Sequence, residues 1–174
     1  MAHLSPVQNG LEQGPPFLPQ DRFEPDNRRH LGGPAIRTFM NIADEWELTE
    51  DERLKVLGFP ARSTYFNWVK KARSHEAVLL PVDTLLRLSG VLGIYKALGV
   101  LFEQRADRAA WLRNPHGAPT FGSTHPMSLV TSGTPDGIMS VRRYLDAFRG
   151  GVFAGPNASV DGTTPLSEDD IVIA

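Results

Sequence analysis

The amino-acid sequence predicts an all-α fold with two functional parts and flexible termini. Apolar residues recur at helical spacing from residue 36 onward, turn residues separate these segments, and no convincing strand alternation is present. The 174 residues are 41% hydrophobic and 22% charged, enough for one modest core or two small ones. Cysteine is absent, which excludes disulfides and thiolate chemistry and favours a cytoplasmic location.

Residues 1–33 are rich in proline and glycine and show no sustained periodicity, so we expect a flexible N-terminal extension. They lack a basic region followed by an apolar run, and no uncharged apolar stretch in the chain approaches the roughly 20 residues of a membrane-spanning helix. We therefore expect no membrane association. Proline is favoured in the first turn of a helix, so we expect the folded part to begin with a helix at Pro34.

Residues 34–79 are predicted to contain a helix-turn-helix domain. Thr49 and Glu52 have the spacing of a capping box, which predicts a helix of about two turns that ends at Gly58. After a tight connection, Ser63 or Thr64 is placed to cap a second helix over residues 65–72. A helix, a short turn and a helix are the outline of a DNA-binding helix-turn-helix.

Charge is segregated within this domain. Residues 44–52 carry six acids and no base, whereas residues 53–73 carry six bases and no acid. A single-sign run of this length is typical of a phosphate-binding surface, although a solvated helix face is the alternative. The second helix is therefore the candidate DNA-reading element. Its predicted DNA-binding residues are Arg62, Ser63, Thr64, Tyr65, Asn67, Lys70, Lys71 and Arg73. Phe66 and Val69 are expected to pack inward.

Residues 80–151 are predicted to form a second helical domain. A broad apolar stripe from Pro81 to Phe102 is typical of a buried central helix, in which Gly90, Gly93 and Gly99 would allow close helix contact. Shorter helices are expected around Trp111 and over residues 126–132, and a last amphipathic helix over residues 134–149. Residues 152–174 carry acids and no base, and we expect a flexible acidic tail.

The residues offer little support for catalysis. None of the five histidines has the i, i+4 partner of a helical metal site, and no phosphate-binding glycine loop or nucleophile motif is present. We therefore predict no catalytic residues, no metal and no cofactor. The remaining enzyme hypothesis is a cluster of His116, His125 and Asp136 in the loops of residues 114–137.

From Leu92 onward, ordered sequence blocks resemble the toxin-binding domain of Xre/MbcA/ParS antitoxins. The blocks are residues 92–98 (LGIYKAL), 111–115 (WLRNP), 121–122 (FG), Pro126 with Leu129, 131–137 (TSGTPDG) and 141–147 (VRRYLDA). The chain departs from the family pattern in the loop, where Ser123-Thr124-His125 replaces a frequent Gly-Arg-Ser or Gly-Arg-Thr.

The resemblance implies a type II antitoxin that neutralises a RES-domain toxin, encoded by the adjacent gene, whose family activity is to degrade NAD. It also implies repression of its own operon through operator DNA, for which we expect a homodimer because one helix-turn-helix buries too little surface for strong specificity. The last helix offers residue types common in protein interfaces. The predicted toxin-binding residues are Arg142, Arg143, Tyr144 and Asp146. The acidic tail is the competing inhibitory element.

The alternative from another class is a plain helix-turn-helix transcription regulator whose C-terminal domain only dimerises. Such a regulator need not be encoded beside a toxin gene, so copurification with the neighbouring gene product distinguishes the two hypotheses.

Overall fold

The computed structural model describes residues 23–149, and these residues form seven α-helices and short 3₁₀ segments without a β-strand. The all-α prediction is therefore confirmed for the described part of the chain. The helices are α1 (Pro25–Glu45), α2 (Glu50–Val56), α3 (Arg62–Arg73), α4 (Val82–Leu101), α5 (Arg105–Arg113), α6 (Pro126–Val130) and α7 (Pro135–Arg149), with the 3₁₀ turn η2 (Pro119–Phe121) between α5 and α6. The predicted acidic tail, residues 152–174, lies outside the described residues.

The first helix begins nine residues before the predicted start, at Pro25 instead of Pro34. Pro25 occupies the first helical position, where a missing N–H has no consequence, and Pro34 lies within the helix. The expected flexibility of residues 1–33 is therefore wrong for Pro25 to Gly33, while residues 1–22 are outside the described part. Packing explains the glycine at position 32, because a Cβ there would stand 2.0 Å from the carbonyl oxygen of Val78. The glycine lets a distant backbone segment pack against α1.

Helices α2 and α3 form the predicted helix, turn and helix. The capping box is present: Glu52 N–H donates to Thr49 Oγ1 at 3.3 Å, and Thr49 N–H donates to Glu52 Oε2 at 2.8 Å. Helix α3 begins at Arg62 and has no side-chain cap, so the prediction that Ser63 or Thr64 would cap it is wrong. Its first turn closes instead through the bond from Tyr65 N–H to the carbonyl of Ala61 at 3.0 Å.

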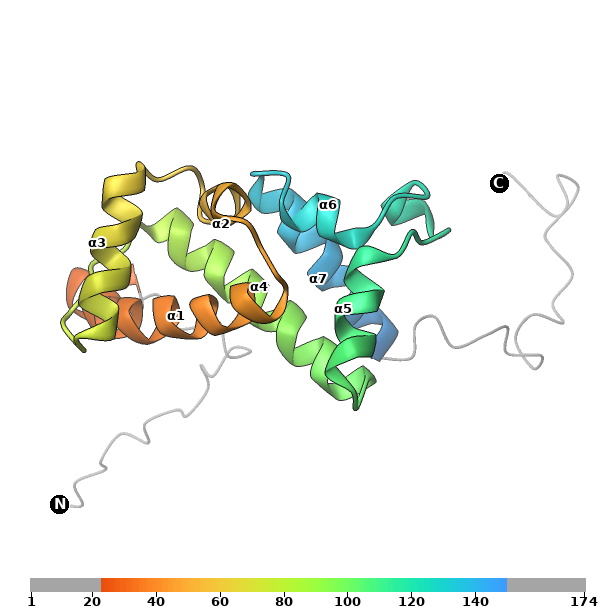
Figure 1. The fold of residues 1–174 in the computed structure, drawn as a ribbon, viewed down its shortest axis with the longest axis horizontal. Helices are drawn as coiled ribbons and strands as arrows, with labels where there is room; N and C mark the ends of the chain where they lie inside the picture. The colour runs from red at the N-terminus through yellow and green to blue at the C-terminus, as the bar shows by residue number, and fades with distance from the viewer. Residues whose placement is uncertain (1–22, 150–174) are drawn as a thin grey trace, which may run out of the picture.

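Helix α4 runs through the centre of the fold between α1 and α7 (Figure 1). Two of its glycines allow the close contact predicted for them. A Cβ at Gly90 would lie 2.7 Å from Ile138 Cγ2, and a Cβ at Gly93 would lie 2.7 Å from Arg142 Nε. Among the described helices, α4 alone is long and apolar enough to resemble a membrane span, but 44% of its most apolar window is buried inside the protein. That burial is typical of a core helix.

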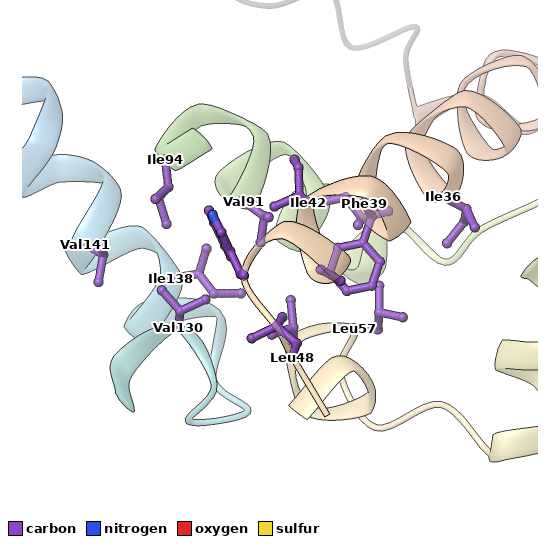
Figure 2. Packing of buried hydrophobic residues seen from close by; sticks show 14 of the residues in the cluster. Ile36, Phe39, Ile42, Leu48, Leu57, Val91, Ile94, Val130, Ile138 and Val141 are labelled. Atoms are coloured by element: carbon purple, nitrogen blue, oxygen red, sulfur yellow. The ribbon is translucent and has the colours of Figure 1, made fainter. Parts of the chain in front are cut away.

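One hydrophobic core extends from α1 to α7. In Figure 2, Val91 of α4 lies near Ile42 and Phe39 of α1. Ile94 of α4 lies on the side that faces α7, near Ile138 and Val141. Both sides of α4 are therefore covered by other helices. The sets of residues predicted to form two domains, 34–79 and 80–151, contribute to the same buried cluster.

Candidate functional site

Helix α3 lies at one end of the molecule, and its outer face is polar (Figure 1). Ser63, Asn67 and Lys70 follow one another at spacings of four and three residues, and all three are exposed. Such spacing puts them on one face of the helix. The opposite face buries Trp68 and packs on α1. Helix α3 thus carries an exposed polar stripe, formed by Ser63, Asn67 and Lys70.

The burial of two aromatic residues of α3 is the opposite of what was predicted. Tyr65 is only 4% exposed and belongs to the core, which corrects its placement among the DNA-reading residues. Phe66, expected to pack inward, is 50% exposed on the outer face, whereas Val69 is buried as predicted. The physical reason is helical periodicity, since residues 65, 68, 69 and 72 lie on one face of α3 and this face packs on α1.

Half of the basic run is paired with the acidic run that precedes it. Arg53 binds Asp44 at 2.6 Å, Lys55 faces Asp51 at 3.4 Å, and Arg62 binds Glu50 at 2.5 Å. In the described part of the chain, no ion pair involves the remaining cations of the run, which are Lys70, Lys71 and Arg73. These three end α3, and they are the cations of the run best available to a phosphate.

On the other half of the protein, α7 packs along α4 and presents the predicted toxin-binding residues. Arg142 lies across α4 above Gly93, donates to the carbonyl of Ser89 at 3.3 Å and faces Asp146 at 3.5 Å. Arg143 is 64% exposed and binds Asp136, on the same helix, at 3.0 Å. The two neighbouring arginines therefore differ, because Arg142 holds two helices together and Arg143 is open to a partner.

An aromatic cluster adjoins this surface, and sequence reasoning largely missed it. Its members are Trp111, His116, Phe121, Tyr144 and Phe148. The ring centroids of Phe121 and Tyr144 lie 4.7 Å apart, and Phe148, stacked on Tyr144 at 6.5 Å, is 48% exposed. Tyr144 and Phe148 are four residues apart on α7, and this spacing was the one signal that could have revealed the outer part of the cluster.

The loop histidines of the enzyme hypothesis both have structural partners. His116 Nε2 hydrogen-bonds to the carbonyl of Trp111 at 2.8 Å, and its ring lies 4.8 Å from that indole. His125 begins α6, where its Nδ1 accepts from the backbone N–H of Ser128 at 3.1 Å. Over residues 23–149, no group of three histidine or acidic side chains could hold a metal ion. Both histidines therefore stabilise the local structure around them through these hydrogen bonds. The described residues offer binding surfaces.

Comparison with known proteins relates the C-terminal part of the chain to a known domain family. Residues 97–151 match the model of the antitoxin Xre/MbcA/ParS C-terminal toxin-binding domain. A relative named "Uncharacterized protein y4oB", from Sinorhizobium fredii (strain NBRC 101917 / NGR234), is 42% identical over 118 residues, which cover 67% of this chain and 84% of that protein. The matched domain begins in the second half of α4 and includes α5, α6 and α7. The chain therefore belongs to the Xre/MbcA/ParS family of antitoxins.

Proposed function

We propose that this antitoxin neutralises a RES-type, NAD-degrading toxin encoded by the adjacent gene. The observation that carries the proposal is the match of residues 97–151 to a toxin-binding domain whose last helix exposes Arg143 and carries Tyr144 and Phe148 of the aromatic cluster. Arginine and aromatic side chains dominate the energetics of many protein interfaces. A cation on an ordered helix also suits a toxin site that accepts an anionic dinucleotide. The RES identity and NAD degradation come from the family resemblance.

The same chain represses its own operon through α3, in this proposal as a homodimer on operator DNA. Support comes from the exposed stripe of Ser63, Asn67 and Lys70 and from the cations that end the helix. Asparagine can bind adenine through two hydrogen bonds, and lysine suits phosphate. The protein acts in the cytoplasm without catalysis of its own, in keeping with a regulatory family.

Toxin inhibition is assigned to α7 in preference to the tail after Gly151. If the tail is flexible, as its sequence predicts, ordering more than 20 residues on binding would cost roughly 1 kcal/mol or more for each residue fixed, whereas α7 is part of the fold before it binds. Tyr144 and Asp146 flank Arg143 and complete the proposed contact, with Arg142 fixing the position of α7 on α4.

The deciding experiment is coexpression with the product of the adjacent gene, followed by copurification and an assay of NAD hydrolysis. The full chain and a chain truncated after Gly151 should both copurify with the toxin and inhibit it. If the truncated chain binds the toxin but no longer inhibits it, the tail is the inhibitory element. If no neighbouring product copurifies, the chain is a plain regulator with a C-terminal dimerisation domain.

A further inference from the structure

A basic pocket lies beside the end of α3, outside the surfaces described above. It has a volume of about 240 Å³ and is formed by the N-terminal half of α1 and the residues that follow α3. Its lining residues are Arg29, His30, Gly33, Pro34, Arg37, His75, Glu76 and Ala77. The lining thus combines two arginines and two histidines with a single carboxylate.

The pocket is held rigidly against the proposed reading helix. Arg37 Nη1 donates to the carbonyl of Ala72 at 2.9 Å, in the last turn of α3. Gly33 is buried, and a Cβ at this position would meet the carbonyl oxygen of Glu76 at 3.4 Å. A side chain at this position would meet Glu76 only at ordinary van der Waals distance, so the direct tie between the pocket and α3 is the Arg37 hydrogen bond. These contacts fix the distance between the pocket and the exposed stripe of α3.

His75 enters the pocket from a backbone conformation that side chains seldom adopt. Its φ is +56°, and it follows α3 at a place where many helices use glycine. The backbone around it closes the helix, because Glu76 N–H donates to the carbonyl of Lys71 at 2.9 Å. Glycine would close the same turn without this strain, but it would remove one of the two imidazoles that line the pocket.

The cations at the mouth of the pocket are accessible. The Arg29 side chain is 56% exposed, and the ion pair that the structure gives it is a 3.4 Å contact with Asp26, which is itself 88% exposed. A pair of this kind is weak and is screened by salt. His30 and His75 are also exposed. An anion could therefore engage Arg29 without breaking a buried interaction.

From these observations we propose that the pocket binds a phosphate of the DNA backbone next to the groove that α3 enters. This inference rests on the proposed DNA-binding function. In a helix-turn-helix the N-terminal residues of the recognition helix contact the bases. Helix α3 has 12 residues and is about 18 Å long, whereas the major groove is about 12 Å wide. The end of α3, and the pocket beyond it, therefore reach the sugar-phosphate wall.

The test compares two variants of the full-length protein, one that removes a positive charge from the pocket and one that removes a negative charge. Arg29→Gln removes a cation and should weaken binding of operator and random DNA by the same factor. Its affinity should also fall about threefold less than that of the wild type between 50 and 200 mM salt, because about one phosphate contact is lost. Glu76→Gln removes the single carboxylate and should strengthen binding of both DNAs. Arg105→Gln, an exposed arginine on α5, is the charge-matched control and should leave binding unchanged.

The outcomes separate this inference from the proposed function. If Arg29→Gln behaves like Arg105→Gln while a Lys70→Ala, Lys71→Ala double variant loses DNA affinity, the pocket inference is wrong and the function of α3 stands. A loss by Arg29→Gln on operator DNA alone would also overturn it, since a phosphate contact does not read sequence. If inorganic phosphate binds through Arg29 while DNA binding is indifferent to it, the pocket takes a free anion and the inference fails. If the wild type binds no DNA, both proposals fail.

Discussion

Arg87 links the turn after α2 to the loop before α7, and it does so from inside the fold. Its side chain is 8% exposed, contacts Asp83 Oδ2 at 2.6 Å and donates to the carbonyl of Gly133 at 2.9 Å. The opposing turn is shaped to fit, because a Cβ at Gly58 would meet Arg87 Nε at 2.9 Å. The buried guanidinium of Arg87 thus packs against Gly58 of the first predicted domain and bonds to Gly133 of the second.

Replacement of Arg87 by alanine should lower the free energy of unfolding by about 1 to 3 kcal/mol. The buried carbonyl of Gly133 would lose its partner, which carries a cost of this size, whereas Asp83 is 57% exposed and can be rehydrated. Urea denaturation measures the change. Arg143→Ala, at an exposed position, is the control and should change stability by less than about 0.5 kcal/mol. Equal stability of the two variants would contradict the role given to Arg87.

Tyr95 provides a stability term that depends on pH. Its pKa is raised above the ordinary 10.0, chiefly because its hydroxyl hydrogen-bonds to Glu45 Oε2 at 3.0 Å. Because the folded-state pKa exceeds the unfolded one, this contribution is fully present below the unfolded pKa and is lost as pH rises through the folded pKa. Tyr95→Phe should therefore be less stable than the wild type near neutral pH, and the difference should shrink on the alkaline side of pH 10. Urea midpoints measured across this range check the prediction. A difference independent of pH would refute it.

Residue-level prediction succeeded where a side chain acts within its own helix and failed where its role depends on phase or on distant partners. The Thr49 and Glu52 capping box is local, and it was predicted correctly. The exchange of Tyr65 and Phe66 depends on which face of α3 packs on α1, and that contact involves a helix distant in the sequence. Two aromatic partners of Tyr144, Trp111 and Phe121, come from α5 and η2, so no local pattern could identify them.

Glycine and proline misled the prediction of where α1 begins, whereas glycine helped to predict how α4 packs. Gly32-Gly33-Pro34 has the composition of a break, yet α1 continues through it, and the backbone of Val78 packs on Gly32. Tertiary packing overrides local propensity there. In α4 the same residue type was interpreted correctly, because Gly90 and Gly93 lie in a long apolar stripe that needs a close neighbour, and α7 is that neighbour.

Arg142 and Arg143 on α7 have different surroundings, and this difference predicts separate effects on toxin binding and on stability. Arg143→Glu should weaken toxin binding at least about tenfold without lowering the melting temperature, since Arg143 is largely solvated in the free antitoxin. Arg142→Glu should weaken binding and also lower the melting temperature, because Arg142 packs over Gly93 and bonds to Ser89. Binding and melting are measured on the same preparations, with Lys96→Glu, an exposed change on α4, as the control. Unchanged toxin binding by Arg143→Glu would remove α7 from the contact.

At the scale of the whole molecule, the proposed boundary at residues 79 and 80 divides functions more clearly than it divides the core. The exposed stripe of α3 and the surface of α7 lie on different parts of the fold (Figure 1). The buried residues beneath both surfaces nevertheless belong to one hydrophobic cluster, which includes residues of α4. A helix that is covered on both sides cannot belong to one folding unit alone without exposing the other side. The composition indicated enough chain for one core or two, and only the three-dimensional packing distinguishes these possibilities.

A fragment of residues 80–151 should therefore unfold less cooperatively than a fragment of residues 23–151. Removal of α1 would expose the apolar side of α4 that carries Val91, and each large apolar side chain brought into water costs about 1.5 to 3 kcal/mol. Two or three such residues equal much of the roughly 5 to 15 kcal/mol that stabilises a typical domain. Urea denaturation followed by circular dichroism compares the fragments, and toxin neutralisation is assayed with both. The shorter fragment should show a lower midpoint and a broader transition, and the toxin should raise its midpoint by binding the folded form. If both fragments unfold at the same urea concentration with equally sharp transitions, residues 80–151 are an independent domain, and α1 to α3 contribute only the proposed DNA-binding surface.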